Sequence, residues 1–122
     1  MNSGPTAEDF FAGHPFPLTV HNRVLDIVGE FAPVEVRVSK SQVALRLRRA
    51  FAYLWLPGQY LAHPEAEVVL SIALGRHDDS LRWKEVAHPS PKHWIHHLEV
   101  RHLADLDDEV VGWLREAAER AR

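Results

Sequence analysis

The stretch VEVRVSKSQVALRLRRAFAYLWL, residues 34–56, determines which fold class the chain can adopt. Its first part, residues 34–38, alternates apolar and polar side chains, which is typical of a strand with one buried face. Residues 43–49 alternate in the same way after the polar connection SKSQ. Residues 51–56 are apolar at both parities, as in a strand at the centre of a sheet. We therefore predict three consecutive strands, and their short connections favour antiparallel pairing.

Helical periodicity flanks these strands on both sides. Apolar residues recur at helical spacing over residues 18–31, and Gly29 and Pro33 are stop signals at the end of that segment. A second helix is predicted near the C-terminus, with Asp105 as its N-cap and Asp108 completing a capping-box-like pair. The apolar stripe of this second helix consists of Leu106, Val110, Trp113, Leu114 and Ala117.

Further strands are predicted between the two helices. Residues 67–75 and 93–100 are strand-like, and an edge strand is expected at 81–86. The fold class is therefore α+β, with an N-terminal helix, a four- to five-stranded mainly antiparallel meander sheet and a C-terminal helix. Both helices are expected to pack on one sheet face. We divide the chain into an irregular N-terminal segment, residues 1–17, and a single α+β domain, residues 18–122.

The composition excludes several classes of protein. The 122 residues have a formal net charge of −3, which argues against nonspecific nucleic-acid binding, and cysteine is absent, which excludes disulfides and cysteine-ligated zinc. No apolar run approaches the ~20 residues that span a bilayer, and the N-terminal residues do not resemble a signal peptide. We expect a cytoplasmic, soluble protein with no role at a membrane.

The sheet face turned away from the helices is the candidate functional surface. Either parity of residues 51–56 fits this face, because a one-residue slip in register turns every side chain to the opposite side. An open face of this kind forms a homodimer interface, docks a protein partner or floors a ligand pocket, unless the N-terminal phenylalanines cover it. The candidate ligand-binding residues are Lys40, Arg46, Arg48, Tyr53, Trp55 and His97.

These candidates define two hypotheses for function. The leading one is a non-enzymatic binding or protein-interaction module that uses the open sheet face. The alternative is a binder of a small anionic ligand, or a weak enzyme, with a pocket around Arg46 and His97, since arginine suits carboxylates and histidine exchanges protons near neutral pH. No nucleophile elbow, Gly-rich phosphate loop or HExxH spacing is found, so a catalytic role is not favoured and no cofactor is expected.

The segment PKHWIHHLEVRH, residues 91–102, contains four of the nine histidines. On a strand, His93 and His97 share one face, whereas His96 and His102 share the other. His93 and His97 lie about 13 Å apart at roughly 3.3 Å per residue, too far to ligate one metal ion without help from another element. We therefore predict no metal site in this cluster.

A resemblance to a known family rests on four segments, VEVRVSKSQVAL, FAYLWLPG, HHLEV and LDDEVVGWLREAAERA. They resemble the uncharacterised family DUF5655 from about residue 8 to the end of the chain. The resemblance implies a compact α+β domain that occurs alone or appended to larger proteins. No activity is established for the family, so no catalytic residue is carried over. A looser similarity exists to small α+β domains of the YdhG-like type.

Overall fold

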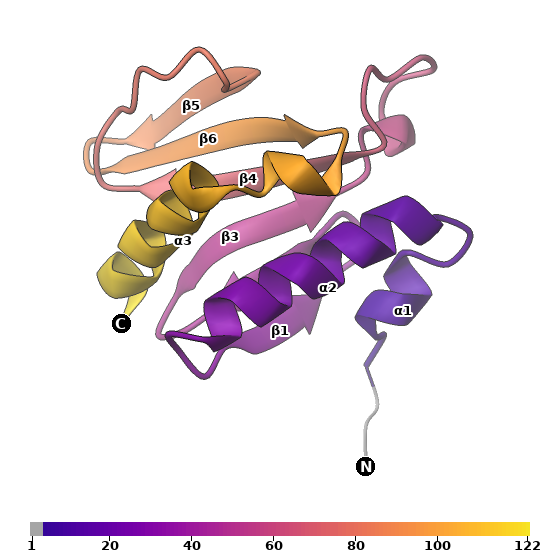
Figure 1. Cartoon of the computed structure of the whole chain (residues 1–122), viewed down its shortest axis with the longest axis horizontal. Helices are drawn as coiled ribbons and strands as arrows, with labels where there is room; N and C mark the ends of the chain where they lie inside the picture. The colour runs from indigo at the N-terminus through magenta and orange to yellow at the C-terminus, as the bar shows by residue number, and fades with distance from the viewer. Residues whose placement is uncertain (1–3) are drawn as a thin grey trace.

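The computed structural model describes residues 4–122, which contain one sheet and three α-helices (Figure 1). Within the described residues the sheet has six strands, and every neighbouring pair is antiparallel. The elements are α1 (Ala7–Phe10), α2 (Pro15–Gly29), β1 (Glu35–Val38), β2 (Val43–Arg46), β3 (Ala50–Trp55), the 3₁₀ turn η1 (Pro57–Gln59), β4 (Val68–Leu74), β5 (Glu85–Ser90), β6 (His93–Val100), the 3₁₀ turn η2 (Leu103–Asp105) and α3 (Asp108–Ala121). The α+β class and the antiparallel sheet are confirmed, whereas the predicted number of four to five strands is wrong.

The strand order is β1-β2-β3-β4-β6-β5, so the meander holds for the first four strands only. After β4 the chain crosses to the edge, forms β5 and returns as β6 between β4 and β5. The edge strand predicted at 81–86 begins at Glu85 instead, as β5. The residues before Glu85 make other contacts. Trp83 is buried against Trp113, with ring centroids 4.2 Å apart, and the Lys84 amide donates to the His97 carbonyl at 2.8 Å.

The helix starts differ from the predicted starts because of local signals in the first turns. Helix α2 begins at Pro15 rather than at residue 18, since proline suits the first turn of a helix. The short helix α1 was not predicted, and a capping box between Thr6 and Asp9 initiates it. Helix α3 uses Asp107 instead of Asp105 as its N-cap. Residues 1–3 of the predicted irregular segment lie outside the described residues.

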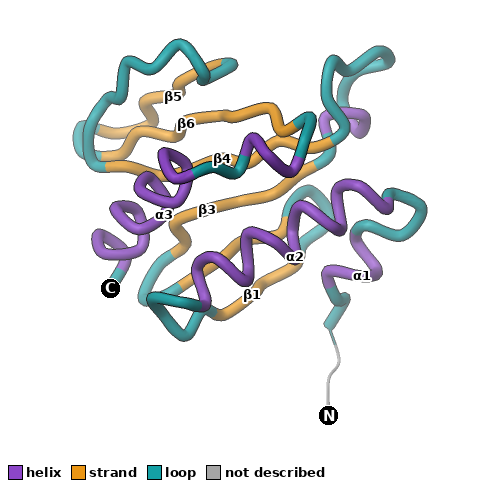
Figure 2. The backbone as a smooth tube through the Cα atoms, viewed as in Figure 1, coloured by secondary structure: helices purple, strands orange, loops and turns teal. Residues whose placement is uncertain are grey.

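The hydrophobic core lies between the helices and one face of the sheet. Figures 1 and 2 show α2 and α3 side by side over the same side of the sheet. A cross-strand row of Val36, Leu45, Ala52 and Ile72 runs across the sheet on the core face. The apolar stripe predicted for the C-terminal helix is buried at all of its positions, which are Leu106, Val110, Trp113, Leu114 and Ala117. Burial of each Leu or Ile side chain contributes roughly 1.5–3 kcal/mol to the free energy of folding. The residues on this face of the sheet therefore stabilise the fold.

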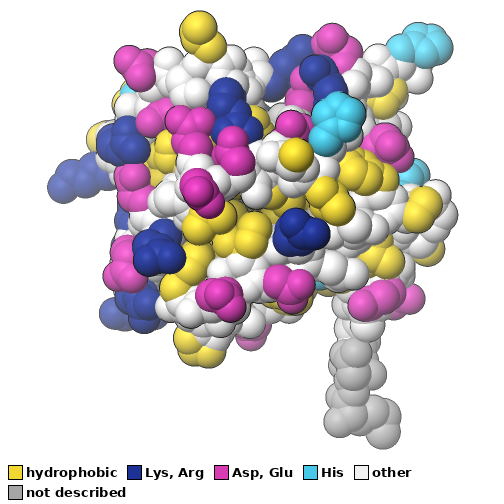
Figure 3. All heavy atoms as spheres, in the orientation of Figure 1, with side chains coloured by type: hydrophobic (Ala, Val, Ile, Leu, Met, Phe, Trp, Pro, Cys, Tyr) yellow, Lys and Arg dark blue, Asp and Glu magenta, His cyan; other side chains and the backbone are white. Residues whose placement is uncertain are grey.

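The helix side of the molecule carries mixed charges. Figure 3 shows acidic and basic side chains interspersed over this side, with hydrophobic atoms visible between them. A furrow between α2 and α3 is lined by Ile27, Phe31 and Val111 together with Asp26, Glu30 and Arg115. None of the helices in residues 4–122 has the length and apolarity needed to cross a membrane.

The register of β3 determines which residues occupy the open face. Ala52 pairs with Leu45 and Ile72, and Leu54 pairs with Val43, so Ala52 and Leu54 face the core. Tyr53 and Trp55 therefore point to the opposite, open face, a choice that the sequence pattern had left undecided.

Candidate functional site

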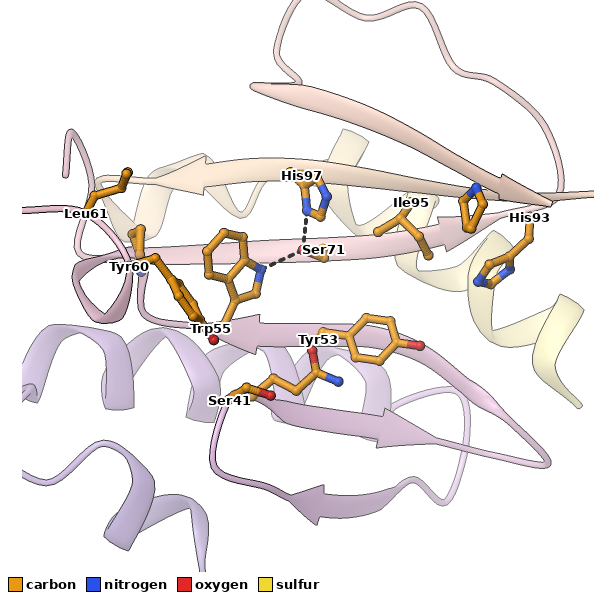
Figure 4. Close-up of a pocket in the computed structure, with 12 residues that line it drawn as sticks. Ser41, Tyr53, Trp55, Tyr60, Leu61, Ser71, His93, Ile95 and His97 are labelled. Carbon is orange, nitrogen blue, oxygen red and sulfur yellow. Dashed lines mark hydrogen bonds between the residues drawn. The ribbon is translucent and has the colours of Figure 1, made fainter.

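A cavity of about 770 Å³ opens on the sheet face that the helices leave uncovered. This volume lies within the range of roughly 300–1,000 Å³ that is typical of small-molecule sites. Strands β3, β4 and β6 form its floor, and two connecting segments form part of its rim (Figure 4). The lining residues are Ser41, Gln42, Tyr53, Trp55, Pro57, Tyr60, Leu61, Ser71, Pro89, His93, Ile95 and His97.

Alternation of large and small side chains hollows the floor. Tyr53, Ser71 and His97 are aligned across β3, β4 and β6 in register, and Ala44 precedes them on β2. Because side chains of one face stand side by side in a sheet, the small Ser71 leaves space between its two larger neighbours. The Gln59 side chain donates to the Lys40 carbonyl at 3.5 Å and so connects the η1 segment to the β1–β2 turn at the rim.

A hydrogen-bond chain crosses the floor. The Trp55 indole Nε1–H donates to Ser71 Oγ at 2.8 Å, and Ser71 Oγ lies 2.6 Å from His97 Nδ1 (Figure 4). The indole N–H can only donate, so it occupies one lone pair of the serine oxygen. The Ser71 hydroxyl can then donate its own hydrogen bond to His97 Nδ1. In the arrangement that satisfies all three groups, His97 Nδ1 accepts and Nε2 carries the ring proton. Burial lowers the pKa of His97, against the opposing effect of the Glu85 carboxylate, so the neutral ring is favoured.

Aromatic side chains line the end of the cavity near Trp55. The Trp55 ring lies edge-to-face with Tyr60 at a centroid distance of 6.0 Å and with His97 at 5.9 Å. Tyr60 and Leu61 are 61% and 58% exposed, which is unusual for large apolar residues in this structure. Exposed apolar side chains at the rim of a cavity are typical of a surface that a ligand or a partner covers.

The opposite end of the cavity, near His93, is polar and lies close to arginines. Burial raises the pKa of the Tyr53 hydroxyl, and the nearby Arg46 guanidinium opposes that shift. The pKa of His93 is lowered, first by burial and then by the charges of Arg120 and Arg49. Arg120 Nη2 lies 3.4 Å from His93 Nδ1, and a guanidinium can only donate, so His93 also holds its proton on Nε2.

The structure brings together three of the six candidate residues. Tyr53, Trp55 and His97 all line the cavity, whereas Lys40, Arg46 and Arg48 do not. Lys40 lies in the β1–β2 turn and lines a separate groove beside α1.

The two arginine candidates have different surroundings. Arg46 acts electrostatically on the Tyr53 hydroxyl, and its Nε lies 3.6 Å from Glu35 Oε1. Arg48 lies with Arg49 and Arg122 in a basic hollow near the end of α3. Sequence reasoning did not select Ser71 as a site residue, although a single polar residue within the apolar run VVLSIAL is a signal that could have found it.

The histidines do not gather around a common point. Within residues 4–122, no group of three or more His, Asp or Glu side chains is arranged to hold a metal ion. His96 lies on the core face, where its Nε2 accepts from the Asp78 amide at 2.9 Å. His93 and His97 line the cavity. In each neutral ring Nε2 carries the proton, and Nδ1 faces the neighbouring Arg120 or Ser71.

Fold and site together define the class of protein. It is a small α+β domain in which helices cover one face of an antiparallel sheet and the other face is hollowed into a ligand-sized cavity. The chain belongs to the family described as Domain of unknown function (DUF5655), whose model matches residues 7–120. The resemblance to that family is thus confirmed, whereas the looser similarity to YdhG-like domains is not shown. The comparisons match no curated protein and no solved structure to this chain.

Proposed function

We propose that this domain binds a small molecule in the open-face cavity. The observation that carries the proposal is the combination of an aromatic wall with a polar floor in a hollow of about 770 Å³. Small-molecule sites are typically concave, largely apolar and equipped with a few oriented polar groups. The Trp55–Ser71–His97 chain supplies such groups without any further partner.

The arrangement favours binding over catalysis. A serine nucleophile needs a free lone pair and a neighbouring base, together with donors for a developing oxyanion. Ser71 has the neighbouring histidine, and the Trp55 indole occupies only one lone pair of its oxygen, but the residue is only 2% exposed, which leaves little access for a substrate. We therefore assign Ser71 to the positioning of Trp55 and His97.

A protein interface is the second candidate for the same face. The exposed Tyr60 and Leu61 at the rim favour it, because large apolar side chains are enriched where proteins associate. A homodimer or a protein partner would need a complementary knob to fill the hollow. The concave shape therefore supports a small ligand ahead of a flat interface.

The test uses N-phenylnaphthylamine (NPN), an uncharged aromatic dye that fluoresces in apolar sites. We expect saturable binding at one site per chain, with the Leu61→Ala variant weakening the affinity about fivefold because a rim contact is lost. Leu81→Ala is the matched control, since Leu81 is fully exposed and does not line the cavity. Equal effects of the two substitutions, or no saturable binding, would overturn the proposal. Light scattering that shows a dimer unable to bind the dye would favour the interface instead.

A further inference from the structure

We infer that the cavity selects an amphipathic anion, an apolar molecule that ends in a single carboxylate or similar acceptor group. This inference rests on the proposed function and specifies its ligand class. It further orients the ligand, with the anionic group near Tyr53 and His93 and the apolar body against Trp55, Tyr60 and Leu61.

The first support is the polarity of the hydrogen-bonding groups in the cavity. The hydrogen-bond chain from Trp55 through Ser71 leaves the proton of His97 on Nε2. The contact of Arg120 with His93 Nδ1 leaves the proton of His93 on Nε2 as well. The Tyr53 hydroxyl has no hydrogen-bond partner among residues 4–122. Three side chains therefore offer N–H or O–H groups at the floor, and a ligand must supply acceptor atoms to satisfy them.

The second support is the distribution of charge. No Asp or Glu side chain lines the cavity among the described residues. Arg46, Arg49 and Arg120 all act electrostatically on the Tyr53–His93 end. In residues 4–122, only Arg46 of these three is ion-paired, through a 3.6 Å contact with an exposed carboxylate of Glu35. The positive charge at this end is thus incompletely balanced, and it favours an anionic group.

The third support is the separation of the two ends. Tyr53 and Trp55 lie two residues apart on β3 and share one face, so their attachment points are about 6.6 Å apart. Glu99 shares a cross-strand row with Trp55 through Val69, and Glu85 lies on the outer strand β5, three strands away from Tyr53. An anion that approaches the arginines at the Tyr53 end therefore stays away from both carboxylates, and the aromatic wall is left for the apolar body.

The test compares two dyes with the same ring system. Anilinonaphthalene sulfonate (ANS) carries one sulfonate, and NPN is the same molecule without it. We expect ANS to bind about tenfold more tightly than NPN, the factor typical of one charge-assisted hydrogen bond. Arg46→Gln should remove most of this preference and leave the NPN affinity within about twofold.

Two further variants make the comparison specific. Arg48→Gln removes the same charge from the same hairpin, but Arg48 lines the basic hollow near the end of α3 and does not act on Tyr53 as Arg46 does, so we expect this variant to preserve the preference. Arg46→Lys keeps the charge, so it should retain most of the ANS affinity even if the Glu35 contact changes. Thermal melts of every variant show whether it is folded.

The possible failures are distinguishable. Equal affinities for ANS and NPN in the native chain, with Leu61→Ala weakening both, would refute the anionic class and leave the cavity proposal intact. Equal losses from Arg46→Gln and Arg48→Gln would show that the preference comes from overall charge, and would overturn the inference as well. Absence of binding by both dyes would overturn the proposed function itself.

Discussion

Replacing Ser71 with alanine tests the hydrogen-bond chain at the floor of the cavity. The substitution removes one acceptor for the Trp55 indole N–H and one partner of His97 Nδ1, at distances of 2.8 and 2.6 Å. Each such bond contributes about 1 kcal/mol net, so the free energy of unfolding should fall by about 2 kcal/mol. For a chain of 122 residues, at about 2.1 cal/mol/K of unfolding entropy per residue, this corresponds to a decrease in Tm of about 8 °C.

The assay is urea unfolding of Ser71→Ala beside Ser41→Ala. Ser41 also lines the cavity, but it is exposed, and its hydroxyl has only a 3.4 Å contact with Ser39 Oγ. We expect the control to change stability by less than about 0.5 kcal/mol. Nitrogen-15 spectra of the native chain should show His97 protonated at Nε2. Equal unfolding free energies for the two variants, or a proton on Nδ1, would refute the chain as described.

Two further predictions concern stability. In the folded chain, burial lowers the pKa values of four histidines below their ordinary 6.5, namely His21, His93, His96 and His97. As the pH falls, these histidines therefore take up protons in the unfolded chain before they do so in the folded chain. The free energy of unfolding should be highest above about pH 6.5 and should fall as the pH drops towards the lower pKa values of the folded state. Unfolding free energies that stay constant between about pH 7.5 and about pH 5 would contradict this prediction. Leu70→Ala, at a fully buried position on β4, should cost about 3 kcal/mol, whereas the exposed Leu81→Ala should cost less than about 0.5 kcal/mol, as measured by urea midpoints; a small loss at Leu70 would show that it lies outside the core.

Local periodicity predicted most elements of the fold, and tertiary contacts decided the rest. The alternation in residues 34–38 and 43–49 was sufficient to place β1 and β2. It could not place β3 on a face, because residues 51–56 are apolar at both parities and only the pairing of Ala52 with Ile72 resolves the choice. The displacement of β5 follows from burial of Trp83 against Trp113, a contact between distant segments that no local pattern reports.

The candidate site was predicted in part for similar reasons. Tyr53, Trp55 and His97 were selected because they are polar or aromatic on strands expected at the open face. Arg48 was selected with them, but it lies in a separate basic hollow near the end of α3. The concavity itself depends on the cross-strand alignment of small Ser71 with larger neighbours, and alignment between strands is a property of register that residue types alone do not determine.

The most direct test of ligand binding is a nitrogen-15 NMR titration of the whole chain with ANS. We expect the shift changes to centre on Tyr53, Trp55, Ser71 and His97, with smaller changes along the rim at Tyr60 and Leu61. Changes centred instead on Ile27, Phe31 and Val111, in the furrow between the helices, would contradict binding at the open sheet face, and so would a titration without shift changes.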